Sequence, residues 1–195
     1  YTVTLVAAML LAKTVFGAAS KWIEFPLMLG AVSIIASIVG TYFVKLGKKQ
    51  YIMGALYKGL AVAGVIAAAA FYFVARYFIA DLGPNAGVFT ANTVFFISLI
   101  GLALTGLIVW ITEYFTAKEY SPVQHIAQAS LTGHGTNVIA GLAVSMKSTV
   151  APVIVIVASI LGAYWLGGGF SGAADAASGG IFAIALAAVS MLSMT

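Results

Sequence analysis

Small and polar residues inside one long apolar stretch are the first candidates for chemistry in this sequence. Asn137, Gly141, Ser145 and Thr149 recur every four residues, so on a helix they lie along one face. A small, polar face inside an apolar helix favours close contact with another helix or with a wet interior. We therefore predict a helix-packing face formed by Gly141, Ser145 and Thr149, with Asn137 as a supporting polar residue.

A lysine on the same predicted helix is the next candidate. Lys147 follows Asn137 by ten residues, about 15 Å along a helix axis. If the helix starts near the membrane interface, this cation lies inside the protein, where an intramembrane charge marks a functional site. If the helix protrudes, Lys147 merely snorkels to the surface. Lys147 should point away from the stripe, and Pro152 should bend the helix just beyond it.

A carboxylate ends the apolar stretch that precedes this helix. Ser98, Gly101, Thr105 and Thr112 form a polar line along that stretch, and Glu113 follows at its end. A carboxylate at the mouth of a membrane helix can hold a cation or a proton. Equally, Glu113 can be an interfacial residue that ends a membrane span. We treat Glu113 as a candidate supporting polar residue, with both interpretations open.

Two other patterns are weak signals. Gly167, Gly169 and Gly172 match G-x-G-x-x-G, but a dinucleotide turn needs a preceding strand, and a flexible external loop is the favoured interpretation. His125 and His134 are nine residues apart without an acidic or cysteine partner at ligand spacing, which indicates two polar loop histidines rather than a metal site. Spacing alone thus predicts no catalytic residue and no metal ligand in this chain.

Composition decides the class of protein to which these residues belong. The chain has 195 residues, of which 63% are hydrophobic and only 7% charged, whereas soluble domains are about 25% charged. Such a chain cannot cover a soluble fold with polar side chains, so we predict an integral membrane protein in the lipid bilayer. Nine dispersed Lys and Arg residues make no nucleic-acid patch, and the absence of cysteine excludes disulfides and thiolate metal sites.

Long uncharged runs predict the elements that position the polar residues. A membrane helix needs about 20 apolar residues, and strict alternation, the mark of a β-barrel strand, is missing. We expect an all-α, polytopic transmembrane helix bundle with about six segments, the first and last incomplete, near residues 1–16, 26–44, 52–78, 88–112, 148–174 and 176–195. Residues 1–195 should form a single membrane domain without a soluble domain. We expect it to be an internal part of a longer polypeptide and a larger bundle.

Local signals predict a short helix and an orientation. Ser121 is the expected N-cap, with Pro122 at the first helical position, Gln124 closing a capping box, and Gly133 ending the helix. The distribution of Lys and Arg places residues 45–51 and 113–135 in the cytoplasm and residues 165–180 outside.

An ordered set of motifs in the middle of the chain resembles the membrane-integral, ion-pumping inorganic pyrophosphatases. Thr112–Thr116 reads T-E-Y-F-T, and a Pro-Val step follows within Tyr120–Gln124. Thr132–Ile139 reads T-G-H-G-T-N-V-I and is followed by Gly141-Leu142. The His134-Gly135 pair resembles proton-pumping, potassium-independent members.

This resemblance implies that the parent protein hydrolyses pyrophosphate with Mg²⁺ on the cytoplasmic side of a bacterial inner membrane. It also implies a homodimer that exports H⁺, or Na⁺ in some members, with the dimer interface near the fifth segment. The family's catalytic Asp and Lys clusters lie on other helices, so none is expected here. The alternative is a helical domain of a secondary transporter or channel without hydrolysis. A purely structural membrane subunit would tolerate substitution of Glu113 and Lys147.

Overall fold

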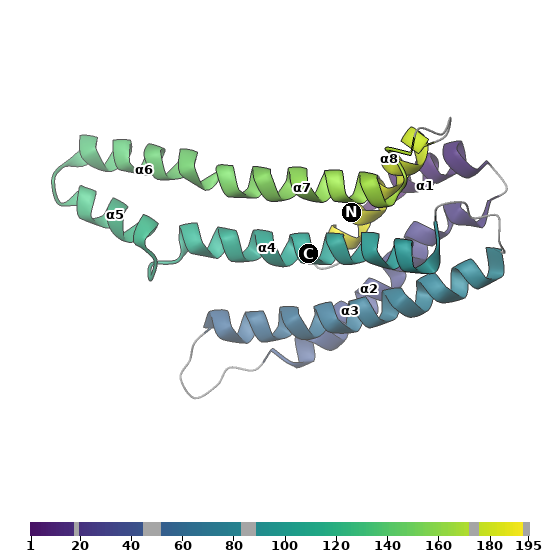
Figure 1. The fold of residues 1–195 in the computed structure, drawn as a ribbon. Helices are drawn as coiled ribbons and strands as arrows, with labels where there is room; N and C mark the ends of the chain where they lie inside the picture. Colours follow the sequence, from purple (N-terminus) through teal and green to yellow (C-terminus); the bar gives the residue numbers. More distant parts are fainter. Residues whose placement is uncertain (18–19, 45–51, 83–88, 172–175, 193–195) are drawn as a thin grey trace. The chain divides into compact units, whose positions relative to one another are not determined.

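The chain folds into helices throughout the part that the structure describes. A computed structural model describes residues 1–17, 20–44, 52–82, 89–171 and 176–192 (Figure 1). Within these ranges every regular element is helical, which confirms the predicted all-α class. The elements are α1 Thr2–Phe16, η1 Lys21–Ile23, α2 Phe25–Tyr42, α3 Ile52–Leu82, α4 Ala91–Thr116, α5 Ser121–Ser130, α6 His134–Ser148, α7 Val150–Leu166 and α8 Ala176–Leu192.

Within the part of the chain that the structure describes, four stretches are long and apolar enough to cross a bilayer. They are residues Lys21–Tyr42, Gly54–Phe78, Ala91–Ser130 and His134–Leu166. The helices α1 and α8 are apolar but shorter. The predicted segments therefore correspond to α1, α2, α3, α4, the α6–α7 pair and α8. The predicted beginning of the third segment, at Ile52, is confirmed, and most other boundaries shift by a few residues.

The fifth segment differs most from its prediction. Its helices run from His134 to Leu166 instead of 148–174, because the T-G-H-G-T-N motif already starts a helix and a glycine run stops it. Gly168 there has a φ of 77°, a left-handed conformation that suits glycine. The regular helix is also interrupted at Thr149, between α6 and α7. Pro152 explains the position, because it has no N–H to donate to the Ser148 carbonyl.

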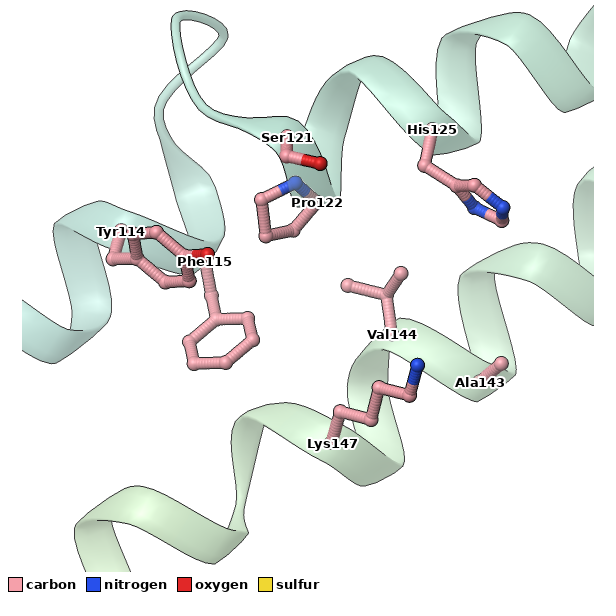
Figure 2. A pocket seen from close by; sticks show the side chains of 8 residues that line it. All are labelled: Tyr114, Phe115, Ser121, Pro122, His125, Ala143, Val144 and Lys147. Atoms are coloured by element: carbon pink, nitrogen blue, oxygen red, sulfur yellow. The ribbon is translucent and has the colours of Figure 1, made fainter.

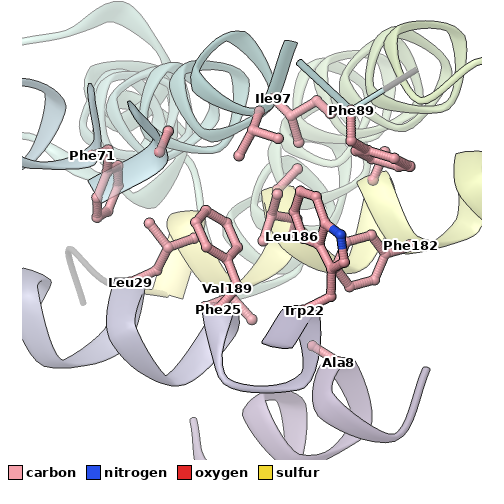
Figure 3. Close-up of a cluster of buried hydrophobic side chains, with 14 of the residues drawn as sticks. Ala8, Trp22, Phe25, Leu29, Phe71, Phe89, Ile97, Phe182, Leu186 and Val189 are labelled. Carbon is pink, nitrogen blue, oxygen red and sulfur yellow. The ribbon is translucent and has the colours of Figure 1, made fainter. Parts of the chain in front are cut away.

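The structure divides into two compact units, and the first holds an aromatic core. This unit comprises Tyr1–Ala103 and Ile160–Thr195. Within it α2 packs along α3, and α1 packs along α8. The rings of Trp22 and Phe16 stack with centroids 5.1 Å apart, and Phe25, Phe89 and Phe182 also contact Trp22 (Figure 3). Burial of these large apolar side chains holds η1 against the helix ends that surround it.

The second unit, Leu104–Ser159, holds the residues of interest. It comprises the end of α4, all of α5 and α6, and the start of α7. Within this unit α5 packs along α6. The predicted cap of α5 is wrong, because its N-cap is Tyr120 and no side chain caps it. The Gln124 side-chain amide donates instead to the Glu119 carbonyl at 3.2 Å, and Gly133 is the N-cap of α6 rather than the end of α5.

Candidate functional site

The second unit contains a cavity at the junction of its helices. The cavity has a volume of about 370 Å³ and lies between the end of α4, the start of α5 and the C-terminal part of α6. Figure 2 shows Lys147 reaching toward it from α6 and His125 from the facing helix. The lining residues are Tyr114, Phe115, Ser121, Pro122, His125, Ala143, Val144 and Lys147.

A compact turn fixes how α5 and α6 meet beside this cavity. The hydroxyls of Thr132 and Thr136 lie 2.8 Å apart, and both are close to the Ala129 carbonyl, at 2.8 and 3.0 Å. Between them Gly133 has a φ of 141°, which a side chain would disfavour. The T-G-x-x-T part of the motif therefore builds a helix–helix turn. This structural role was not predicted from the sequence.

The structure places Lys147 on the cavity wall. Its side chain is exposed within the described chain rather than buried among helices. It lies on the α6 face that carries Ala143 and Val144 toward the cavity, while Ser145 is exposed. The predicted direction, away from the small-residue stripe, agrees with this arrangement. The structure thus brings Lys147 together with His125, a neighbour that sequence spacing did not reveal.

Glu113 is a buried carboxylate near the end of α4. Only 6% of the residue is exposed, although it lies just five residues before Lys118, which is exposed. Ser98 and Thr105, which we predicted on one polar line with it, are also buried. Thr112 departs from that line, because it is exposed and donates to the Ile108 carbonyl of its own helix at 2.8 Å.

The predicted packing stripe on α6 is open within the described chain. Asn137 and Gly141 are half-buried, whereas Ser145 and Thr149 are exposed. A Cβ added at Gly141 would meet no described atom within 4 Å. The Asn137 Oδ1 atom is buried and accepts no hydrogen bond from the described residues. No contact within the second unit fills the space beside Gly141, and the packing face stays a prediction.

The structure also places the two histidines and the glycine pattern that were weak signals in the sequence. His125 lies on α5 and His134 begins α6, so neither is in a loop. The described residues contain no group of three His, Cys, Asp or Glu side chains placed to hold a metal. Gly167 follows a helix rather than a strand, which excludes a dinucleotide turn. A Cβ on Gly167 would lie 2.9 Å from the Gly179 carbonyl, so this glycine packs closely, whereas Gly172 of the same pattern lies outside the described residues.

Comparison with known protein families decides where this chain belongs. All residues, 1–195, match the family described as inorganic H⁺ pyrophosphatase. The chain belongs to that family. The resemblance seen in the central motifs is thereby confirmed, and it extends over the whole sequence, including the aromatic core and the open face of α6.

Individual relatives agree with this assignment. The chain is 53% identical over 150 residues to pyrophosphate-energized proton pump 2 of Rhizobium leguminosarum bv. trifolii, covering 75% of this chain and 69% of that protein. It is 46% identical over 168 residues to pyrophosphate-energized proton pump 2 of Mycoplana dimorpha, covering 83% of this chain and 81% of the relative.

A longer relative matches almost the entire chain. The K(+)-insensitive pyrophosphate-energized proton pump of Methanosarcina mazei is 39% identical over 193 residues, or 99% of this chain. The matched stretch covers only 27% of that pump. The chain therefore spans about a quarter of the length of this relative.

Proposed function

We propose that this chain is part of a membrane pump that couples pyrophosphate hydrolysis to export of H⁺, or of Na⁺. The observation that carries the proposal is the family match over all 195 residues. Four apolar stretches of membrane-crossing length support it. Family membership favours the pump over the alternative of a secondary transporter or channel without hydrolysis.

In this proposal the chain supports the chemistry rather than performing it. Pyrophosphate and Mg²⁺ bind to carboxylate and lysine clusters in the rest of the parent protein, because Mg²⁺ prefers carboxylates and substrate phosphates as ligands. Glu113, Asn137 and Lys147 serve as supporting polar residues. The burial of Glu113 supports this role, since a buried carboxylate is costly unless its surroundings stabilise it.

The proposal includes a homodimer in a bacterial inner membrane. The chain contributes a single membrane domain to each subunit, and the Gly141, Ser145 and Thr149 face of α6 packs against a helix outside the described residues. The open space around Gly141 and the exposure of Ser145 and Thr149 support such a contact. Small residues on a membrane helix allow another helix to approach closely.

The parent protein should also act without potassium. The His134-Gly135 pair motivated this expectation, and the Methanosarcina mazei relative is named K(+)-insensitive. Pyrophosphate hydrolysis by the parent protein should therefore proceed at the same rate with and without K⁺. A clear increase on addition of K⁺ would contradict this part of the proposal.

Phosphate release from pyrophosphate by the purified full-length protein tests the enzymatic half of the proposal. Release should require Mg²⁺, stop on chelation with EDTA and resume when Mg²⁺ is restored. The matched control is the 195-residue chain alone, which should be inactive because it lacks the carboxylate clusters. An inactive full-length protein in native-like membranes would refute the proposal.

A further inference from the structure

We propose that the cavity between the end of α4, α5 and α6 binds a phosphate group, carried by a phospholipid headgroup or by free phosphate. The cavity lies entirely within the second unit, Leu104–Ser159. Binding there does not depend on where pyrophosphate is hydrolysed.

The polar groups that line the cavity suit an anion. Lys147 contributes an ammonium group with three donors, Ser121 a hydroxyl, and His125 a ring N–H in either protonation state. Tyr114 adds a phenolic hydroxyl. None of the eight lining residues is acidic, so the only formal charge among them is positive at neutral pH. Donors without a competing carboxylate favour a phosphate over a cation.

Figure 2 shows how these donors are arranged. His125 projects from α5 toward α6, and the Lys147 side chain extends from α6 toward the same space. The Ser121 hydroxyl points to that space from the first turn of α5. Donors from two helices thus line the same cavity, where one ligand can reach more than one of them.

The apolar part of the lining favours a lipid as the source of the phosphate. Phe115, Pro122, Ala143 and Val144 contribute carbon atoms beside the donors. A phosphate on a glycerol backbone presents both a charge and an apolar edge, whereas free phosphate presents only the charge. Basic pockets between membrane helices are known to hold lipid headgroups. The volume of about 370 Å³ leaves room for more than a single phosphate group.

The walls of the cavity are fixed by contacts between protein residues. The hydroxyl contacts of Thr132 and Thr136 set the angle between α5 and α6. The rings of Tyr114 and Tyr120, 5.3 Å apart, join the end of α4 to the start of α5. Because these contacts require no ligand, the cavity is preformed, and the entropy cost of binding is reduced.

Native mass spectrometry of the delipidated full-length protein tests the proposal. The probe is a short-chain phosphatidylglycerol added in a titration. Lys147→Met should weaken phosphatidylglycerol binding about tenfold, the size expected when one charge-assisted hydrogen bond is lost. Lys147→Arg should retain most of the binding. The matched control is Lys118→Met, which removes an exposed cation from the α4–α5 turn but not from the cavity lining.

Inorganic phosphate, added alone and as a competitor, distinguishes the two sources. If phosphatidylglycerol binding depends on Lys147 and inorganic phosphate does not displace the lipid, the site binds a lipid headgroup. Phosphate binding that depends on Lys147 and displaces the lipid assigns it to free phosphate. Unchanged binding by Lys147→Met would overturn the proposal, and so would an equal loss in Lys118→Met. The intact mass of each variant's assembly in the same spectra shows that it has folded.

Discussion

Buried polar side chains in this chain fall into two groups according to how they are satisfied. Ser98 donates to the Val94 carbonyl at 3.0 Å, and Ser190 donates to the Leu186 carbonyl at 3.0 Å. Serine can satisfy its hydroxyl on its own helix, so these residues need no functional explanation. Glu113 is a buried carboxylate, which is costly to bury unless its surroundings stabilise it, and the buried Oδ1 atom of the half-buried Asn137 accepts no hydrogen bond from the described residues. They are the better functional candidates.

Replacement of Glu113 by Gln tests the first of these candidates. The change keeps the shape of a buried residue and removes its charge. We expect the full-length protein to assemble normally and to hydrolyse pyrophosphate about tenfold more slowly, as expected when a hydrogen-bonded charge is lost. The measurement is phosphate release per dimer.

Thr112→Val is the matched control for this change. Thr112 is adjacent but exposed, and its hydroxyl bonds only to its own helix. We expect the control to retain its activity. Full activity in Glu113→Gln would contradict a functional role for the carboxylate and would favour the interpretation that Glu113 only ends a membrane span.

Close helix contacts dominate at the scale of the elements. A Cβ on Gly101 would lie 2.9 Å from both the Met191 backbone nitrogen and the Ser190 Cβ, so α4 and α8 touch there through their backbones. Gly101→Val should therefore separate these helices and lower the free energy of unfolding by about 1–3 kcal/mol. The measurement is the midpoint of thermal unfolding of the full-length protein in detergent.

Gly106→Ala provides a control on the same helix. A Cβ at Gly106 meets no described atom within 4 Å, and alanine favours the helix over glycine by about 0.5–1 kcal/mol. The midpoint of thermal unfolding of Gly106→Ala should rise or stay the same. If both variants unfolded at the same temperature, the backbone contact at Gly101 would not matter to stability.

The open face of α6 leads to a different element-scale prediction. A Cβ at Gly141 meets no described atom within 4 Å, so we attribute any damage in Gly141→Leu to a partner helix that packs on this face. We expect loss of the dimer through overpacking of about 1–3 kcal/mol, measured by size-exclusion chromatography with light scattering. Gly135→Leu, on a different face of the same helix, should remain dimeric. A fully dimeric, fully active Gly141→Leu protein would refute the packing face.

The helices could be predicted better than their ends. Uncharged runs locate α2, α3 and α4, because a bilayer tolerates few charges in a span. The end of the fifth segment could not be located in this way, because the glycines after Leu166 are as uncharged as the helix before them. The start of α5 was misplaced by one residue, because Ser121 caps no backbone N–H and Pro122 fits either of the first two helical positions.

The candidate cavity could not be predicted from the sequence at all. Tyr114, His125 and Lys147 are separated by turns, and their meeting depends on the geometry at Gly133. The sequence does indicate one part of the cavity, the placement of His125 beside Ser121. The two are four residues apart and therefore share a face of α5. Glu113 and Lys147 could be selected as unusual charges, but only the structure shows that one is buried and the other lines a cavity.

The orientation of the chain in the membrane is a prediction about the whole molecule. The distribution of Lys and Arg places the α4–α5 turn in the cytoplasm and residues 165–180 outside. The 45–51 loop, which carries several of these lysines, lies outside the described residues. Single cysteines at Lys118 and Ser171, both exposed, should react with an impermeant reagent from opposite sides of sealed vesicles. Labelling of both from one side would contradict the predicted topology.

Coupling between hydrolysis and ion movement is the central claim, and one measurement tests it directly. The full-length protein is placed in sealed vesicles with its cytoplasmic side outward, and pyrophosphate and Mg²⁺ are added outside. The lumen should acidify, as reported by a pH-sensitive dye, and the gradient should collapse when a protonophore is added. Phosphate release with no gradient of H⁺ or Na⁺ would contradict the account, because it would leave an enzyme that does not pump.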